Sequence, residues 1–387
     1  MKKLFALAIL VCLFLMTIPL PAIAETEDWS QTGTSGLGNE DNWGVVTMET
    51  FDDALYAGTL NSTTGGEVWQ TPDGETWTQT NTDGFGDPTN WGASALESFN
   101  GDLYAGTANE ITGTEVWQSP DGSAWTQTNT DGFGDANNTI TYSLTTFNNN
   151  MFAGTQNDIT GAEVWRTPDG TAWGQVNTDG FGDSNNSAVY PLTTFNNYLY
   201  AGTLNLTTGT EIWRSSDGTT WVQTNTDGFG SASNWGTASL TAFENYLYAG
   251  TINYATGTEV WRSSDGTTWL QVNTDGFGDP NNTSTGAMIV YNNSLYAGTG
   301  SGGLIVVIGE QNIQNGAGTG AEVWRTSDGT SWTQVNADGF GTADNRAIFS
   351  FAVFNDYLYA GTLNINGTQI WRHYGIPAPQ ELPYTGK

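Results

Sequence analysis

Paired aspartates recur along this chain in glycine-rich segments of the form Asp-Gly-Phe-Gly-Asp. Carboxylate oxygens held by tight glycine turns are ligands that a hard cation such as Ca²⁺ prefers. The pattern therefore predicts calcium sites at Asp83, Asp87, Asp131, Asp135, Asp179, Asp183, Asp275 and Asp279. It suits equally a purely structural turn, in which Asp shapes the backbone and Phe fills a gap between neighbouring units.

Three tryptophans and one arginine break an otherwise regular pattern. Trp43, Trp91, Trp235 and Arg346 share one position of an internal repeat, where the other copies carry Thr or Ser. Aromatic rings beside polar side chains are typical of carbohydrate recognition. The four residues are therefore candidate ligand-binding residues, and a shielding cap over a central channel is the alternative.

The residues that enzymes use for covalent and acid–base chemistry are scarce. The chain has one histidine, His373, and one cysteine, Cys12, which leaves neither a Ser-His-Asp nor a Cys-His arrangement with support. A thiolate or multi-histidine metal site is excluded for the same reason. Most glutamates recur in register with the repeat, whereas a catalytic pair is expected at non-repeating positions. We therefore expect a binding protein and not an enzyme.

The strongly acidic composition limits the classes of partner. The formal net charge is −31, with 9 basic against 40 acidic residues. Long-range repulsion makes nucleic acid and anionic membrane surfaces implausible ligands. Divalent cations, neutral polymers such as glycans, and basic proteins remain open, and a simple solubility role for the charge is the alternative.

The N-terminus has the features of a secretory signal peptide over residues 1–24. Lys2 and Lys3 precede an apolar run, and the small residues Ala22 and Ala24 suggest cleavage before Glu25. An uncleaved membrane anchor is the alternative. Cleavage would remove Cys12, so the mature chain would depend on packing and strand pairing instead of disulfides. We expect a secreted protein with no membrane span in its mature form.

An internal repeat indicates the fold. Tyr-Ala-Gly-Thr begins at Tyr56, Tyr104, Tyr200, Tyr248, Tyr296 and Tyr359, with Phe152 in the remaining copy. Successive copies lie 48 residues apart, except that the last interval is 63, which places an insertion at about residues 300–317. The second unit divides into strands over residues 92–99, 102–107, 115–118 and 124–129, joined by turn residues. Four strands per unit of this length predict an all-β, seven-bladed β-propeller over residues 25–374.

The two ends of the repeat region complement each other. Trp29 begins a lone fourth strand, whereas the last unit stops after its third strand at Trp371. Pairing these strands would close the ring and remove an open sheet edge. An open solenoid is the alternative architecture, but complementary half-units are not the polar caps that solenoids need. We expect a closed, monomeric ring.

The turn between the third and fourth strands reads Ser-Ser-Asp-Gly-Thr-Thr-Trp at residues 215–221, and related forms occur in five other units. It resembles the Asp-box hairpin of sialidase-like (BNR-repeat) propellers, although Asp and Gly are adjacent here. The resemblance implies a propeller fold, because the Asp-box is distant from the active site in that family. Sialidase-type chemistry would require three converging arginines. Five of the six arginines share one repeat position and should point outward: Arg166, Arg214, Arg262, Arg325 and Arg372.

The tail over residues 375–387 contains prolines and ends in Leu382-Pro383-Tyr384-Thr385-Gly386. This resembles the sortase cell-wall sorting motif, which implies sortase as a partner and a wall-anchored location. An accidental match is the alternative. Together these features predict a cell-surface binding or adhesion protein that recognises a glycan or another extracellular polymer or protein. A structural envelope protein and a glycan-processing enzyme are the alternatives.

Overall fold

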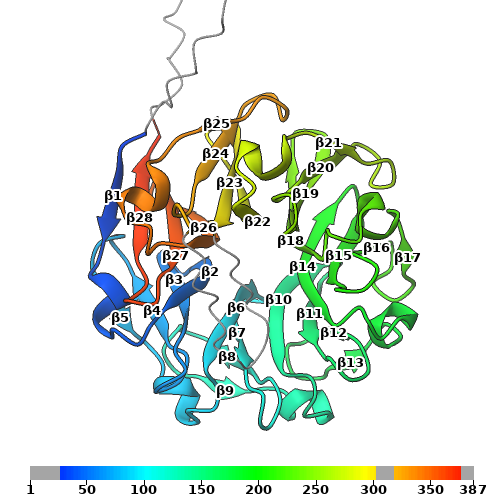
Figure 1. Ribbon diagram of the computed structural model, residues 1–387. Helices are drawn as coiled ribbons and strands as arrows, with labels where there is room; N and C mark the ends of the chain where they lie inside the picture. Colours follow the sequence, from blue (N-terminus) through cyan, green and yellow to red (C-terminus); the bar gives the residue numbers. More distant parts are fainter. Residues whose placement is uncertain (1–26, 302–317, 376–387) are drawn as a thin grey trace, which may run out of the picture.

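The computed structural model describes residues 27–301 and 318–375, and in these ranges the chain is all-β. Strands β1 to β28 surround a common centre and are joined by hairpins, loops and short 3-10 turns (Figure 1). The expected β-propeller fold is confirmed. Among the described residues, no helix is long and apolar enough to cross a membrane. The predicted signal peptide, most of the predicted insertion and the sorting-like motif lie outside these ranges.

Strands of four kinds follow one another from the centre to the rim. The innermost strands are β2 (Gly44–Phe51), β6 (Gly92–Phe99), β10 (Ile140–Phe147), β14 (Ala188–Phe195), β18 (Gly236–Phe243), β22 (Asn282–Tyr291) and β26 (Ala347–Phe354). The second strands are β3 (Ala54–Leu60), β7 (Asp102–Ala108), β11 (Asn150–Gln156), β15 (Tyr198–Leu204), β19 (Tyr246–Ile252), β23 (Ser294–Ser301) and β27 (Tyr357–Leu363).

The outer half of each blade is shorter. The third strands are β4 (Val68–Thr71), β8 (Val116–Ser119), β12 (Val164–Thr167), β16 (Ile212–Ser215), β20 (Val260–Ser263), β24 (Val323–Thr326) and β28 (Ile370–Tyr374). The outer strands are β5 (Thr78–Gln79), β9 (Thr126–Gln127), β13 (Gly174–Gln175), β17 (Val222–Gln223), β21 (Leu270–Gln271), β25 (Thr333–Gln334) and β1 (Trp29–Thr32). The 3-10 turns are η1 (Ser35–Gly38), η2 (Asp83–Gly86), η3 (Asp131–Gly134), η4 (Asp179–Gly182), η5 (Asp227–Gly230), η6 (Asp275–Gly278) and η7 (Asp338–Gly341).

The blade β6–β9 shows how closely the sequence predicted the strands. The innermost strand β6 has the expected bounds, but the outer strand β9 has two residues where six were expected. The chain nevertheless stays attached beyond β9, because the Asn129 side-chain oxygen accepts the backbone N–H of Val116 at 2.7 Å. An amide side chain thus replaces the backbone partner, which is why pattern reasoning overestimated the strand.

The ring is closed by its two ends. β1 lies beside β28 (Figure 1) and pairs with it in antiparallel fashion, with Gln31 opposite Trp371. Glu27 reinforces the joint, because its carboxylate accepts hydrogen bonds from Arg325 and Tyr296 and contacts His373 Nε2 at 3.0 Å. The predicted pairing of the two end strands is confirmed.

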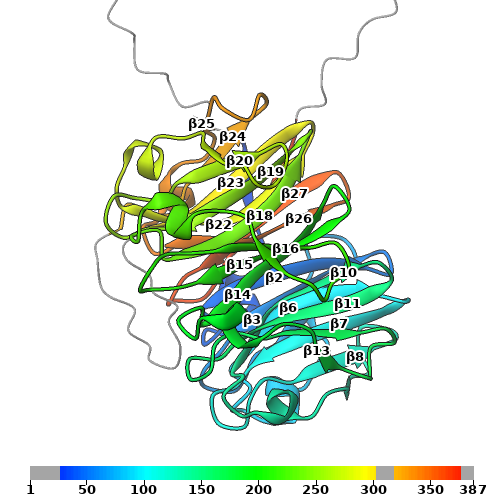
Figure 2. The same ribbon diagram turned by 90° about the vertical axis from the view of Figure 1, so that its right-hand side faces the viewer.

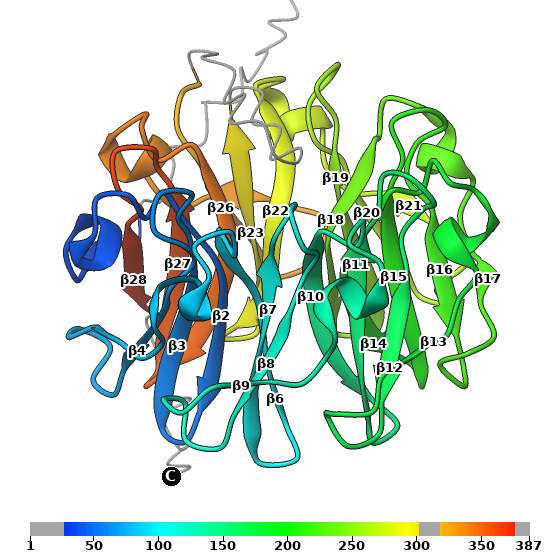
Figure 3. The ribbon, with the colours of Figure 1, turned by 90° about the horizontal axis from the view of Figure 1, so that it is seen from below.

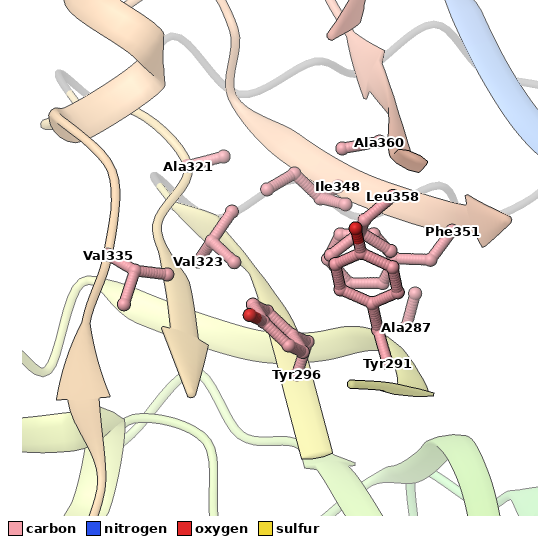
Figure 4. Close-up of a cluster of buried hydrophobic side chains, with 10 residues drawn as sticks. All are labelled: Ala287, Tyr291, Tyr296, Ala321, Val323, Val335, Ile348, Phe351, Leu358 and Ala360. Atoms are coloured by element: carbon pink, nitrogen blue, oxygen red, sulfur yellow. The ribbon is translucent and has the colours of Figure 1, made fainter. Parts of the chain in front are cut away.

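The core lies between neighbouring blades, whose sheets face one another around the ring (Figure 2). Figure 4 shows one such cluster, to which Tyr291 and Tyr296 of one blade and Phe351 and Leu358 of the next contribute. At the rim, the crossover Phe133 stacks on Trp165 of the following blade with ring centroids 4.7 Å apart. The predicted gap-filling role of this phenylalanine is confirmed.

The Asp-Gly hairpins are built as their residue types suggest. Asp217 Oδ1 accepts the backbone N–H groups of Thr219 and Thr220 at 2.8 and 2.7 Å, which lowers the pKa of its carboxyl. In the equivalent turn, Gly122 has φ of 75° and a Cβ there would lie 2.0 Å from the Tyr56 hydroxyl. Both the backbone angle and the close tyrosine therefore require glycine.

The ring has two distinct faces, seen from the side in Figure 3. We call the face where the innermost strands begin and the second strands end the loop face; Gly44 lies opposite Leu60 there. The other face carries the hairpins that join these strands, such as residues 52–53 and 100–101, and is called the hairpin face. The candidate tryptophans precede innermost strands and so belong to the loop face.

Candidate functional site

One repeat position on the loop face makes the same backbone hydrogen bond in each blade but carries different side chains. Its members are Trp43, Trp91, Thr139, Ser187, Trp235, Thr283 and Arg346. Each carbonyl accepts a backbone N–H from the last residue of the second strand of the preceding blade or the residue after it, as Trp91 does from Asn61 at 2.8 Å. This shared backbone hydrogen bond does not require a large side chain, so it does not explain why tryptophan and arginine occur at some copies.

Two of the three tryptophans come together. The indole rings of Trp43 and Trp91, on adjacent blades, stack with centroids 6.3 Å apart and an interplanar angle of 12°. Trp235 is separate from them and packs on Tyr254, with ring centroids 5.1 Å apart. The predicted tryptophan group is therefore one pair and one distant member.

Arg346 immediately precedes the innermost strand β26, in the blade next to that of Trp43. Trp43 and Phe349 both pack against Ala347 and Leu363 at this junction. The Nη1 atom of Arg346 is buried and has no hydrogen-bond partner. The three predicted residues Arg346, Trp43 and Trp91 thus lie on consecutive blades.

Unpaired polar atoms accumulate along this arc. Trp43 Nε1, Trp91 Nε1, Thr139 Oγ1 and Arg346 Nη1 are buried, and none makes a hydrogen bond within the described parts of the chain. A buried polar group without a partner costs about 1–3 kcal/mol. Most other unpaired atoms belong to recurring structural Trp and Tyr residues, so this non-repeating group on four consecutive blades calls for another explanation.

A second group on the loop face was missed from the sequence. Tyr142 and Tyr190 stack with centroids 4.1 Å apart, and the Tyr142 hydroxyl donates to Gln156 Oε1 at 2.8 Å. Gln156 Nε2 in turn donates to Asp158 Oδ2 at 3.0 Å. Burial raises the pKa of Tyr142 well above its ordinary value and that of Tyr190 to about 12. Both phenols therefore stay neutral at physiological pH.

Glu110 stands beside this group. Burial raises the pKa of its carboxyl, the charge of Asp158 raises it further, and its Oε1 atom is buried without a partner. A comparison of the repeats position by position could have found both groups. The copies equivalent to Tyr142 and Tyr190 are otherwise Val46, Ser94, Ala238, Gly286 and Phe349.

The predicted calcium ligands are engaged in their own turns. The first aspartate of each pair accepts a glutamine side-chain N–H at 2.7 Å, as Asp131 does from Gln127. The second caps the following backbone, as Asp135 does for the N–H of Asn137 at 3.0 Å. No three acidic, histidine or cysteine side chains gather into a metal-binding group in the described ranges. The hydrogen bonds favour the turn interpretation, and the calcium sites stay a prediction.

The recurring glutamates and arginines have structural partners. Glu115 Oε2 accepts hydrogen bonds from Asn90 of the crossover and from Trp117, at 2.7 and 2.8 Å. Arg214 lies over the Tyr198 ring at 4.6 Å and donates to the Asp265 carbonyl of the next blade. Arg262 and Arg372 likewise cover tyrosines of their own blades. These contacts lie within a blade or between neighbouring blades and need no ligand.

A carboxylate pair near the hairpin face was also not anticipated. Glu49 and Glu97 occupy one position of adjacent innermost strands, and Glu49 accepts a hydrogen bond from Ser98 at 3.0 Å. Burial raises the pKa of the Glu97 carboxyl to about 7, and the Glu49 carboxylate adds to the shift. The pair lies toward the opposite face from the tryptophans.

No protein-family model matches the chain, and no curated protein matches it in sequence. Solved structures do match in fold. The WD40 β-propeller domain of Doa1 gives a TM-score of 0.55 at 11% identity, over 89% of this chain and 96% of that one. An ancestral GH74 enzyme gives 0.60 at 15%, over 90% and 51%. Saccharomyces cerevisiae Sqt1 gives 0.51 at 11%, over 92% and 100%.

These identities show a shared β-propeller fold and nothing finer. These neighbours include a WD40 propeller domain and an enzyme, so the fold alone does not separate binding from catalysis.

Proposed function

We propose that this protein is a non-catalytic binding propeller, exported to the cell surface, that recognises a glycan or another exposed polymer through its loop face. The observation that carries the proposal is the arc of unpaired polar atoms on Arg346, Trp43, Trp91 and Thr139. These atoms would gain partners from a ligand that enters between the side chains. The recurring hydrogen bonds of the blades do not involve these four atoms.

The chemistry of the arc suits a carbohydrate. Indole and guanidinium groups only donate, so they need acceptor oxygens of the kind that sugars present. The stacked rings of Trp43 and Trp91 add an apolar surface for the face of a pyranose. The net charge of −31 disfavours an anionic polymer, which leaves neutral glycans as the best match.

The partners of the histidine and of most arginines in the described ranges favour binding over histidine-based or sialidase-type catalysis. In the described ranges, the only histidine, His373, is 5% exposed and belongs to the ring closure beside Glu27. Four of the five recurring arginines have local partners in their blades or at the closure. Arg346 is therefore the arginine of the site, and a single guanidinium suits recognition.

The test is a glycan array probed with the mature protein, followed by calorimetry on the strongest neutral ligand. Trp43→Phe combined with Trp91→Phe keeps aromatic rings and removes both indole N–H donors. We expect about tenfold weaker binding with an unchanged melting temperature, because the lost donors had no partner in the free protein. Trp221→Phe is the control, since its Nε1 donates to the Val176 carbonyl at the rim. The proposal is overturned if the protein binds no neutral glycan on the array. It is also overturned if Trp221→Phe loses as much affinity as the double variant.

A further inference from the structure

Three neighbouring blades present exposed apolar side chains in equivalent loops of the loop face. Ile111, Ile159 and Leu206 follow β7, β11 and β15 and are 71%, 69% and 50% exposed. The corresponding loop after β3 carries Ser62 and Thr63 instead. A single exposed apolar residue is unremarkable, but a patch on adjacent blades indicates an interaction surface.

These loops hold their side chains in fixed positions. The Asn109 side-chain oxygen accepts the backbone N–H of Ile111 at 2.9 Å, and Asn157 does the same for Ile159 at 3.0 Å. Both asparagines are fully buried. The apolar side chains are therefore presented from an ordered backbone, which reduces the entropy lost on binding a partner.

Carboxylates alternate with the apolar residues. Glu110 and Asp158 directly precede Ile111 and Ile159, and they interact electrostatically with each other. Glu110 Oε1 lacks a partner in the described parts of the chain. Within the described ranges the arginines lie elsewhere: five are in third strands, and Arg346 precedes β26. A basic group of a binding partner would relieve the repulsion between Glu110 and Asp158.

Aromatic rings adjoin the carboxylates. Tyr142, which stacks on Tyr190, is linked to Asp158 through Gln156 by hydrogen bonds of 2.8 and 3.0 Å. The two tyrosine rings stack on each other, so the groups that would bind a cation here are the carboxylates. Lysine or arginine side chains suit this surface better than a bare metal ion, because their aliphatic stems can also cover apolar side chains.

We propose that the surface formed by Glu110, Ile111, Asp158, Ile159 and Leu206 docks a basic polypeptide segment in which Lys or Arg alternates with apolar residues. The basic side chains bind Glu110 and Asp158, and the apolar ones cover the two isoleucines and the leucine. The net charge of −31 steers such a segment toward the protein. This surface uses none of the residues of the proposed glycan arc, so either function can fail without the other.

The probe is a short fluorescent peptide in which Lys alternates with Leu, titrated with the mature protein and followed by anisotropy. A Lys/Ser peptide of equal charge is the matched probe. We expect the Lys/Leu peptide to bind at least about tenfold more tightly than the Lys/Ser peptide. Glu110→Gln with Asp158→Asn, and separately Ile111→Ser with Ile159→Ser, should each weaken binding by about tenfold.

Two control variants carry the same changes outside the surface. Ile365→Ser alters the equivalent loop after β27, where Ile365 is 40% exposed, and Asp344→Asn removes an exposed charge. Both should stay within about twofold of the parent. Equal loss in the controls, or equal affinity for the two peptides, overturns the proposal in favour of diffuse charge attraction. Tighter binding of a cationic amino-sugar polymer than of the peptide also overturns it. Melting curves establish that each variant is folded.

Discussion

The Glu49–Glu97 pair places two carboxyl groups where burial disfavours their ionised form. The carboxyl group of Glu97 has a pKa raised to about 7 by burial and by the neighbouring Glu49. In the unfolded chain it would ionise near 4.5. Folding therefore works against ionisation of this group, and its effect on stability depends on pH.

We predict that Glu97→Gln stabilises the protein at pH 8 and has little effect at pH 4.5. The raised pKa means that stability is fully present below 4.5 and is lost as pH rises through 7. The variant removes that loss, which amounts to about 1–3 kcal/mol above pH 7. Urea unfolding at the two pH values measures it, with the exposed Glu40→Gln as the control. An equal effect at both pH values would contradict the prediction.

Sequence reasoning at the residue scale succeeded where a residue type was conspicuous. Trp43, Trp91 and Arg346 were found because tryptophan and arginine are rare outside the repeat, and the structure places them on consecutive blades. Tyr142 and Glu110 were missed because tyrosine and glutamate also serve the repeat elsewhere. Their departure from the repeat is visible only when equivalent positions of the units are compared. That Tyr142 and Glu110 lie close together depends on which blades are neighbours in the ring.

At the scale of elements, the crossover turns explain most of the repeated residues together. In η3, Gly132 and Phe133 both have positive φ, so Phe133 reaches the next blade and stacks on Trp165. Asn138 of the same crossover donates to Glu163, which accepts the Trp165 indole N–H. One crossover thus fixes a turn, a ring contact and a buried glutamate, which accounts for the recurrence of all these residues.

We predict that removing calcium leaves the thermal unfolding transition unchanged. Each candidate carboxylate already accepts hydrogen bonds from its own turn, as Asp83 does from Gln79 at 2.7 Å. Calorimetric scans with EDTA and with added Ca²⁺ should therefore coincide. A transition that rises with Ca²⁺, and loses that rise in Asp131→Asn with Asp135→Asn, would establish the calcium sites instead.

The elements themselves were largely predictable because turn chemistry marks their ends. The Asn100-Gly101 hairpin bounds β6 and β7 as expected. The outer strands were not predictable in length, because side chains such as Asn129 take over hydrogen bonds that a strand would make. The asparagine recurs at the equivalent position of other blades, but its residue type alone does not show that it accepts a backbone N–H in place of a strand.

At the scale of the whole molecule, one joint between the chain ends closes the ring. β1 supplies the outer strand that β28 lacks, and Glu27 ties it to Arg325 and His373. Burial raises the pKa of Glu27, while its basic neighbours oppose the shift. The joint covers the outer edge of β28 with β1.

A chain that begins at Gly33 should melt earlier than one that begins at Glu27 and should associate in solution. The shorter chain lacks β1, which exposes the edge of β28 and the ring of Trp371 to other copies. Scanning calorimetry and light scattering after size exclusion measure both effects. If the two chains melt at the same temperature and both are monomeric, the closure contributes nothing to stability.

The proposed function requires that the unpaired indole N–H groups of Trp43 and Trp91 donate hydrogen bonds to a bound ligand. NMR of the tryptophan side chains tests this most directly. In protein labelled with ¹⁵N-tryptophan, Trp43→Phe and Trp91→Phe assign the two indole signals. Titration with a glycan that binds should shift both signals downfield as they gain acceptors, and leave Trp221 and the other rim indoles in place. Binding that leaves the Trp43 and Trp91 signals unmoved, or that shifts the rim signals instead, would contradict the account.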